Sequence, residues 1–281
     1  MFHVKQKALK YKRQYAIIQE RKREVMKRQM GKTIAIANQK GGVGKTTTAV
    51  NLCAALQSRD KSVLLIDCDP QGNATTGMGI NKEKIKSIYD VMFRDVKAWD
   101  AVVATKYGHV IGSQSDLAGA NVELVNMPHR ETILKDSIRE LKEKYTYIII
   151  DCPPSLELLT INALTAADTV LIPVQTEFYA LEGVSDLINT IKIIKKRMNP
   201  SLEIEGFVLT MFDHRTKLSS DVEDNLRQYF PGKVFQTSVP RNVRLSEAPS
   251  HGKPCIAYDK SSKGSRAYLH LANELIKRNR A

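Results

Sequence analysis

A single glycine-rich segment organises this chain, and it reads Asn38-Gln-Lys-Gly-Gly-Val-Gly-Lys-Thr-Thr-Thr48. An apolar run, Thr33–Ala37, precedes it, and Ala49–Leu56 follows with the composition of a helix. Strand, glycine loop and helix in this order are the context that a phosphate-binding loop requires. Glycines let backbone N–H groups approach a phosphate that a Cβ would hold away, and the helix N-terminus adds further free N–H groups. The segment therefore predicts a site for the phosphates of a nucleotide.

The residues of this loop are suited to binding the phosphates of a nucleotide and its Mg²⁺. Lys45 is expected to reach the β- and γ-phosphates of ATP, and the Thr46 hydroxyl is expected to bind Mg²⁺. The alternative is a glycine-rich turn without a ligand, which the flanking strand, the Lys-Thr-Thr triplet and the helix argue against. The residues that we expect to contact the nucleotide here are Lys40, Gly41, Gly42, Val43, Gly44, Lys45, Thr46 and Thr47.

The loop departs from the usual G-x-x-x-x-G-K-[ST] pattern at its first position, where Gln39 replaces a glycine. A second lysine, Lys40, follows it directly. This variant resembles the deviant Walker A loop of the ATPase group that includes ParA, MinD and the nitrogenase iron protein. The resemblance implies that Lys40 crosses a dimer interface to the nucleotide of the partner and joins Lys45 in catalysis.

Two more apolar runs end in aspartates. Ser62–Ile66 leads into Asp67-Cys-Asp-Pro-Gln-Gly-Asn, and Tyr145–Ile150 leads into Asp151-Cys-Pro-Pro. Carboxylates at the carboxyl ends of parallel strands lie beside the ligand crevice. Asp69 is thus a candidate for positioning Mg²⁺ and the attacking water. Asp151 follows a Walker B-like pattern and is a candidate for holding Mg²⁺ through a water or for orienting Thr46. A capped strand end is the alternative for each.

The alternation of buried-strand and helix patterns predicts an α/β fold. We expect a doubly wound, mostly parallel sheet flanked by helices, of the P-loop NTPase type, in one domain over residues 31–281. The expected strands are 33–38, 62–66, 110–112, 122–125, 145–150, 169–174, 207–211 and a short strand that starts at 234 and leads to 238–242. The expected helices are 44–58, 85–93, 130–144, 156–166, 182–198, 221–229 and 265–277.

The charge of the chain is unevenly distributed. The 281 residues carry a formal net charge of +13, which predicts attraction to a polyanion. Residues 1–30 contain ten Lys/Arg and two Glu and so hold +8 of that charge. We interpret them as a frayed, disordered extension in preference to a basic amphipathic arm. Met30-Gly-Lys-Thr-Ile resembles a natural start of translation, which raises the alternative that the native product lacks residues 1–29.

The composition also excludes several classes of protein. Four cysteines lie far apart without a C-x-x-C pair, which favours a reducing cytosol over a disulfide framework. No apolar run reaches the roughly 18 residues of a membrane span. The basic N-terminus has neither the apolar core nor the cleavage site of a signal peptide.

Four segments together carry a family resemblance: Lys40–Thr47, Asp67–Thr76, Asp151–Pro154 and Pro240–Pro254. From about residue 30 to the end, the chain resembles a small, Soj-like ParA partitioning protein. This resemblance implies an ATP-dependent homodimer that binds DNA without sequence preference, and slow Mg²⁺-dependent hydrolysis stimulated by a ParB-like centromere-binding partner. It implies that Pro240 and Asn242 contact the adenine. Residues 1–29 lack a helix-turn-helix pattern, which argues against operator binding.

A basic stretch near the C-terminus is the candidate DNA surface. Residues 233–266 contain seven Lys/Arg and two acidic residues in a turn-rich sequence. We select Lys260, Lys263 and Arg266 as the DNA-contacting set, with a scattered solvated surface as the alternative. The expected location is the cytoplasm, in association with the nucleoid.

Three other functions compete with this interpretation. A MinD-like ATPase of the division site would share the loop and Lys40, but it needs a C-terminal amphipathic helix for the bilayer. Leu269–Ala281 has no Phe or Trp and favours a docking helix, with no membrane contact. An iron–sulfur ATPase needs a cysteine pair at a dimer interface, and Cys152 has no evident partner. A binding module without significant turnover is the third alternative.

Overall fold

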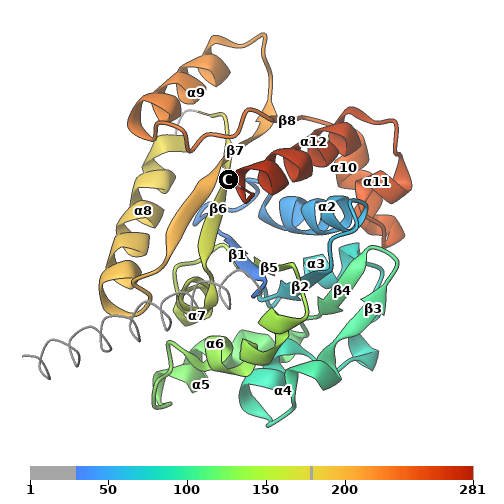
Figure 1. Ribbon diagram of the computed structural model, residues 1–281, viewed down its shortest axis with the longest axis vertical. Coiled ribbons are helices and arrows are strands. Elements are labelled where there is room, and N and C mark those ends of the chain that lie inside the picture. The colour runs from blue at the N-terminus through green and yellow to red at the C-terminus, as the bar shows by residue number, and fades with distance from the viewer. Residues whose placement is uncertain (1–29, 178–179, 281) are drawn as a thin grey trace, which may run out of the picture.

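One eight-stranded sheet runs through the protein (Figure 1). The computed structural model describes residues 30–177 and 180–280. The strand order is β3-β4-β2-β5-β1-β6-β7-β8, and every neighbouring pair is parallel except β3 with β4. The expected doubly wound, mostly parallel sheet is therefore confirmed. The strands are β1 Lys32–Ile36, β2 Val63–Asp67, β3 Val103–Thr105, β4 Gly108–Ile111, β5 Tyr147–Asp151, β6 Thr169–Gln175, β7 Glu203–Phe212 and β8 Val239–Pro240.

Helices cover both faces of the sheet. The central strands read as continuous apolar runs because both of their faces are buried: all five positions of β2 and of β5 are buried. One apolar core packs under α4 to α9 and the other under α2 and α12. The helices are α2 Lys45–Gln57, α3 Asn73–Gly77, α4 Ile88–Phe93, α5 Ala120–Val125, α6 Ile133–Ser137, α7 Leu158–Ala166, α8 Ala180–Arg197, α9 Lys217–Tyr229, α10 Val243–Glu247, α11 Cys255–Tyr258 and α12 Lys263–Arg278.

The C-terminal helix α12 docks along α2. Its apolar residues Leu271 and Leu275 are fully buried. The Tyr268 hydroxyl lies 3.1 Å from the Thr48 hydroxyl of α2. The expectation of a docking helix is confirmed, because its apolar face is occupied by the protein itself. No helix within the described residues is long and apolar enough to span a membrane.

Three predicted elements are wrong or only partly right. Residues 122–125 lie in helix α5 rather than in a strand, and Val122 and Val125 are exposed while Leu124 alone packs inward. The predicted helix 130–144 is two short pieces, α6 and a 3₁₀ segment Arg139–Glu143. Val234 makes a single bridge to Phe207, and the strand itself is only β8. In the first and third cases a short apolar run left the choice of element to tertiary packing. The predicted helix 130–144 is interrupted at Ile138, whose φ of -101° and ψ of 5° depart from helical values. The basic extension, residues 1–29, lies outside the described residues.

Candidate functional site

The loop between β1 and α2 has the backbone of an anion cradle. Gly42 and Gly44 both adopt left-handed conformations, with φ of 75° and 88°. Gly44 is the N-cap of α2, and no side chain of the described residues caps that end of the helix. A Cβ added at Gly41 or Gly42 would meet nothing within 4 Å, so this side of the loop is open. The first N–H groups of α2 are thus available to a phosphate.

Lys45 is folded against its own loop. Its side chain is buried, with the residue 6% exposed, and its Nζ donates to the Lys40 carbonyl at 2.9 Å. Burial lowers the pKa of Lys45 below its usual 10.5, whereas the carboxylates of Asp151 and Asp69 act in the opposite direction. A buried cation that a main-chain carbonyl holds in place gains most from a phosphate, because the phosphate restores the charge partner that water no longer supplies.

Two aspartates meet at the ends of β2 and β5. Asp67 and Asp151 are partners in the register of these two strands, and both are fully buried. Asp67 is satisfied: it accepts bonds from the Thr75 N–H at 2.8 Å and the Thr75 hydroxyl at 2.7 Å. Burial nevertheless raises the pKa of Asp67 to about 6. Asp67 therefore fixes the turn that follows β2, a structural task that its place in the sequence motif did not reveal.

Asp151 differs from Asp67 because its carboxylate lacks partners. Neither of its oxygens accepts a hydrogen bond of ordinary geometry from the described residues, although the side chain is fully buried and the Thr46 hydroxyl is near enough to lower its pKa. Burial raises the pKa of Asp151 well above its usual range, and the charge of Asp67 adds to this effect, while Thr46 and Lys45 oppose it. A buried carboxylate of this kind fits a site for a divalent cation or its bound water. The residues present therefore suit Mg²⁺, with Thr46 and Asp151 beside it.

Asp69 lies two residues beyond the end of β2. It is 8% exposed, its Oδ1 accepts the Gln71 N–H at 2.9 Å, and its own N–H donates to Asp67 at 3.2 Å. Its remaining carboxylate oxygen accepts no bond from the described residues, so it has an acceptor to offer a water. Asp69 is also close enough to influence the charge of Lys45 and Asp151. The structure thus gathers Lys45, Asp69 and Asp151 at one edge of the sheet, as expected for parallel strands.

Lys40 is a loop residue whose side chain forms an ion pair with a residue outside the loop. Its Nζ forms an ion pair with Glu177, at the end of β6, and its N–H donates to Asn38 Oδ1 at 3.0 Å. The side chains of Lys40 and Glu177 are 38% and 33% exposed. Within one chain, the Lys40 side chain is therefore paired with Glu177, while its main-chain carbonyl accepts the bond from Lys45. The sequence alone did not suggest Glu177, because 137 residues separate the two partners.

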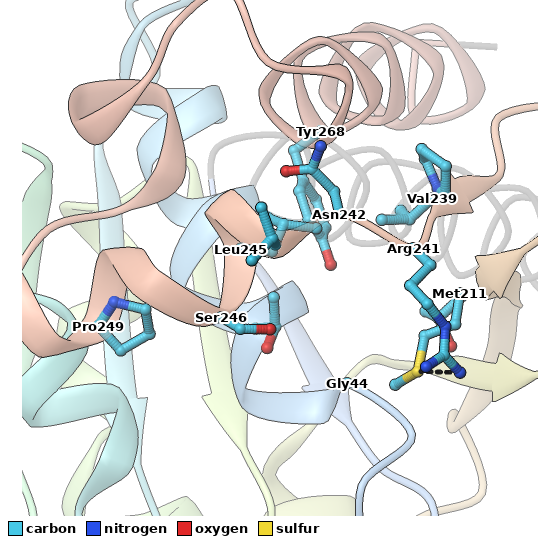
Figure 2. Close-up of a pocket in the computed structure, with 13 residues that line it drawn as sticks. Gly44, Met211, Val239, Arg241, Asn242, Leu245, Ser246, Pro249 and Tyr268 are labelled. Atoms are coloured by element: carbon cyan, nitrogen blue, oxygen red, sulfur yellow. Dashed lines mark hydrogen bonds between the residues drawn. The ribbon is translucent and has the colours of Figure 1, made fainter.

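A pocket of about 460 Å³ opens beside the loop (Figure 2). Pro240 and Asn242 both line it, together with Gly44 and Thr47, so the expected adenine contacts do lie next to the expected phosphate contacts. Asn242 Oδ1 caps α10 by accepting the Arg244 N–H at 3.1 Å, which fixes the amide at the pocket wall. The lining residues that the sequence did not suggest are Thr210, Met211, Val239, Arg241, Val243, Leu245, Ser246, Pro249 and Tyr268.

The candidate DNA residues are exposed at the start of α12 and just before it. Lys260, Lys263 and Arg266 make no ion pair with any described residue. By contrast, Arg244 pairs with both acidic residues of the stretch, Glu247 at 2.8 Å and Asp259 at 3.4 Å. The acidic residues are thus neutralised locally and the three selected cations are left to solvent. Lys260 also borders a groove that contains Arg59 and Lys106, which sequence reasoning missed.

The cysteines give no support to an iron–sulfur site. Cys68 and Cys152 follow the paired ends of β2 and β5, so Cys152 does have a neighbouring cysteine. Both are buried in the core, with exposures of 1% and 0%, and burial raises the pKa of each thiol. Iron–sulfur clusters are held by Cys thiolates, whereas the raised pKa of these two groups favours the protonated thiols. The described residues contain no cluster of three or more His, Cys, Asp and Glu side chains of the kind that binds a metal without other ligands, and the Mg²⁺ site described above is not of that kind.

Comparison with known proteins places these features in a family. Residues 31–204 match the model of a family described as an AAA domain. The chain is 55% identical to the sporulation initiation inhibitor protein Soj of Bacillus subtilis, over 88% of this chain and 98% of that protein. It is 53% identical to the chromosome partitioning protein ParA of Myxococcus xanthus, over 89% of each.

A solved structure shares the fold and contains a nucleotide. It is cobyrinic acid a,c-diamide synthase of Mycobacterium smegmatis, determined with ADP and magnesium bound. The two chains are 36% identical with a TM-score of 0.78, and the match covers 90% of this chain and 96% of the other. A protein with this fold thus holds a magnesium nucleotide.

Proposed function

Since the chain belongs to the Soj/ParA family of partitioning ATPases, we propose that it binds ATP with Mg²⁺, dimerises, binds DNA without sequence preference and hydrolyses ATP. The observation that carries this proposal is the meeting of Lys45, Asp69 and the unpartnered Asp151 at one edge of the sheet. Phosphoryl transfer needs positioning and neutralisation of charge more than covalent help from the protein. This group of side chains supplies both.

Each residue has a definite task in this proposal. The N–H groups from Gly41 to Thr47 hold the phosphates, and Lys45 leaves the Lys40 carbonyl to bind the β- and γ-oxygens. Bound Mg²⁺ neutralises the phosphate oxygens, and Thr46 and Asp151 are the residues that would hold it. Asp69 orients the attacking water with its free carboxylate oxygen.

The adenine occupies the pocket that Pro240 and Asn242 line. Its volume of about 460 Å³ suits a base and ribose, and it opens directly onto Gly44 and Thr47. Asn242 keeps its amide N–H groups for the base because only its Oδ1 is used in capping α10. Base and phosphates are therefore held by opposite ends of one continuous site.

The proposal that the protein dimerises rests on the position of Lys40. Its ammonium group is paired with Glu177, and the side chain is 38% exposed. A lysine held at the rim in this way can reach the nucleotide of a second copy, which would couple dimerisation to ATP. A ParB-like partner would then accelerate hydrolysis and release the dimer. These steps would take place in the cytoplasm, on the nucleoid.

Turnover tests the enzymatic part of the proposal. The full chain with Mg²⁺ should release phosphate from ATP slowly, and a ParB-like protein with DNA should increase the rate. A Lys45→Ala chain is the control for contaminating ATPases. The chain could instead bind ATP and release no more phosphate than the control, even with the partner present. That result would support the alternative function, a nucleotide-dependent binding module without significant turnover.

The DNA surface has its own test. Lys260, Lys263 and Arg266 changed together to Glu should weaken DNA binding equally at all sequences. Each lost phosphate contact should flatten the log–log salt dependence by about 0.9, so three contacts give about 2.7 per subunit. The matched control changes exposed cations on α8, on the opposite face of the sheet. Its three positions are Lys192, Lys196 and Arg197.

The outcomes separate three assignments. If the variant with Lys260, Lys263 and Arg266 changed to Glu no longer binds DNA but still dimerises with ATP, these three residues belong to the DNA-binding surface. If the control variant on α8 no longer binds DNA instead, the DNA-binding surface lies on the face of the sheet that α8 covers. If both retain DNA but deletion of residues 1–29 removes binding, the basic extension carries it. Anionic liposomes in a parallel sedimentation test address the MinD-like alternative, which the burial of the apolar face of α12 disfavours.

A further inference from the structure

One hydrogen bond ties the phosphate loop to a strand far away in the sequence. The hydroxyl of Thr210, on β7, donates to the Val43 carbonyl at 2.8 Å. The two residues are 167 positions apart, and both are buried, with exposures of 3% and 2%. Because the bond is shielded from water, its loss would leave a main-chain carbonyl unpaired inside the protein.

This bond fixes the direction of the next amide of the loop. In a trans peptide the C=O and the following N–H point in opposite directions. With the Val43 carbonyl held toward β7, the Gly44 N–H points away from β7. Gly44 also has a φ of 88°, and no described residue accepts its N–H. The loop therefore presents a free N–H, in a fixed orientation, at the N-terminus of α2, where a phosphate is expected.

The shape of β7 makes this contact possible. Neighbouring residues of a strand normally point to opposite faces. Thr210 and Met211 both line the pocket, and the register of β7 with β8 shifts between Thr210 and Phe212. Met211 adopts a left-handed conformation, with φ of 50°, at this irregularity. Bulges of this kind re-aim side chains next to functional sites.

The same bulge joins the two halves of the nucleotide site. Met211 lines the pocket beside Arg241, whose Nη2 lies 4.0 Å from the Met211 sulfur (Figure 2). Thr210, one residue earlier, holds the loop. The base pocket and the phosphate loop thus share one irregular stretch of strand.

We propose that Thr210 is a positioning residue for the phosphates: it holds the Val43 carbonyl so that the Gly44 amide is aimed at the nucleotide. The proposal rests on the proposed ATP site. Thr210 need not touch the nucleotide to have this effect. Its hydroxyl should therefore matter for ligands that carry a β-phosphate and not for adenosine, which would occupy only the base pocket.

The test compares two variants of nearly equal size. Thr210→Val keeps the shape and removes the donor, whereas Thr210→Ser keeps the donor. Calorimetry with Mg²⁺-ADP should give an affinity about tenfold weaker for the valine variant, which corresponds to the loss of one buried hydrogen bond and the freed loop. The serine variant should match the wild type. Adenosine, followed by ligand-detected NMR, should bind all three proteins alike.

Several results would overturn the assignment. An unchanged ADP affinity in Thr210→Val, an equal loss in Thr210→Ser, or an equal loss for adenosine would each show that the hydroxyl does not orient the phosphate loop. A lower thermal midpoint without nucleotide, together with normal ADP affinity, would show a purely structural role. If the valine variant does not fold, Thr210→Ala replaces it in the same comparison. Failure of the wild type to bind ADP would instead refute the proposed ATP site, on which this inference depends.

Discussion

Removing the ion pair that holds Lys40 should strengthen the ATP-dependent dimer. In the single chain, Lys40 pairs with Glu177. If Lys40 must reach the partner's nucleotide, this pair competes with the dimer contact. Glu177→Gln keeps the size of the side chain and removes its charge, so Lys40 is released at no cost in volume. The dimer should then form at lower protein concentration.

The size of this effect follows from exposure. The two side chains are 38% and 33% exposed, which makes this a partly solvated pair. Such a pair contributes about 0.2–1 kcal/mol. A symmetric dimer breaks two of them, so the gain is about 0.4–2 kcal/mol, or roughly a 2- to 30-fold lower dimer dissociation constant. The gain should shrink at high salt, because exposed charges are screened.

Sedimentation equilibrium with a non-hydrolysable ATP analogue measures the dissociation constant directly. The matched control is Glu203→Gln, which breaks another solvated ion pair, with Lys195, away from the loop. In a Lys40→Ala background the Glu177 change should have no effect, since the two substitutions remove the same interaction. Unchanged dimerisation in Glu177→Gln at low salt, or the same gain in the control, would refute this explanation of the pair.

Four further changes probe the loop and the carboxylates. Lys45→Ala should remove measurable ATP binding in calorimetry, because Lys45 is the loop cation expected to meet the β- and γ-phosphates; retained binding would contradict the loop assignment. Asp69→Ala should still bind ATP and stay on DNA, with phosphate release reduced by about 10²-fold or more, and loss of ATP binding would instead make Asp69 structural or an essential Mg²⁺ ligand. Asp151→Asn should raise the Mg²⁺ concentration needed for ATP binding, and an unchanged Mg²⁺ titration would exclude Asp151 from the cation site. Gly44→Ala should lower the free energy of unfolding by about 1 kcal/mol or more in a urea titration, because a Cβ is disfavoured at a φ of 88°; unchanged stability would show that the loop adopts another backbone.

The parts of the site that could be predicted are those encoded locally. The loop carries its glycines and lysines within one short segment, and Asp151 directly follows an apolar run whose burial on both faces is visible in its composition. Parallel pairing then brings the strand ends together whatever the loops do. This is why the sequence predicts that Lys45, Asp69 and Asp151 lie close together at the carboxyl ends of neighbouring strands.

The site residues that the sequence did not reveal are those that only the topology of the sheet brings near the phosphate loop. Thr210 and Glu177 reach the loop from β7 and from the end of β6, across sequence separations of 167 and 137. Their segments have no pattern that differs from an ordinary strand end. The run at 122–125 shows the converse problem. Its β-branched residues favour a strand, but only Leu124 packs into the core while Val122 and Val125 stay exposed, and the run forms α5.

The packing of α12 on α2 relates the basic residues to the nucleotide site. Lys263 and Arg266 occupy the first turn of α12, and Tyr268, just beyond them, meets Thr48 of α2 through a hydroxyl pair at 3.1 Å. Thr48 in turn begins the helical bonding of α2, because its N–H donates to the Gly44 carbonyl at 2.9 Å. The phosphate loop and the proposed DNA residues are therefore carried by two helices in direct contact. A dimer that positions one loop through Lys40 would then fix the spacing between the two α12 surfaces, which is what simultaneous contact with one DNA duplex requires.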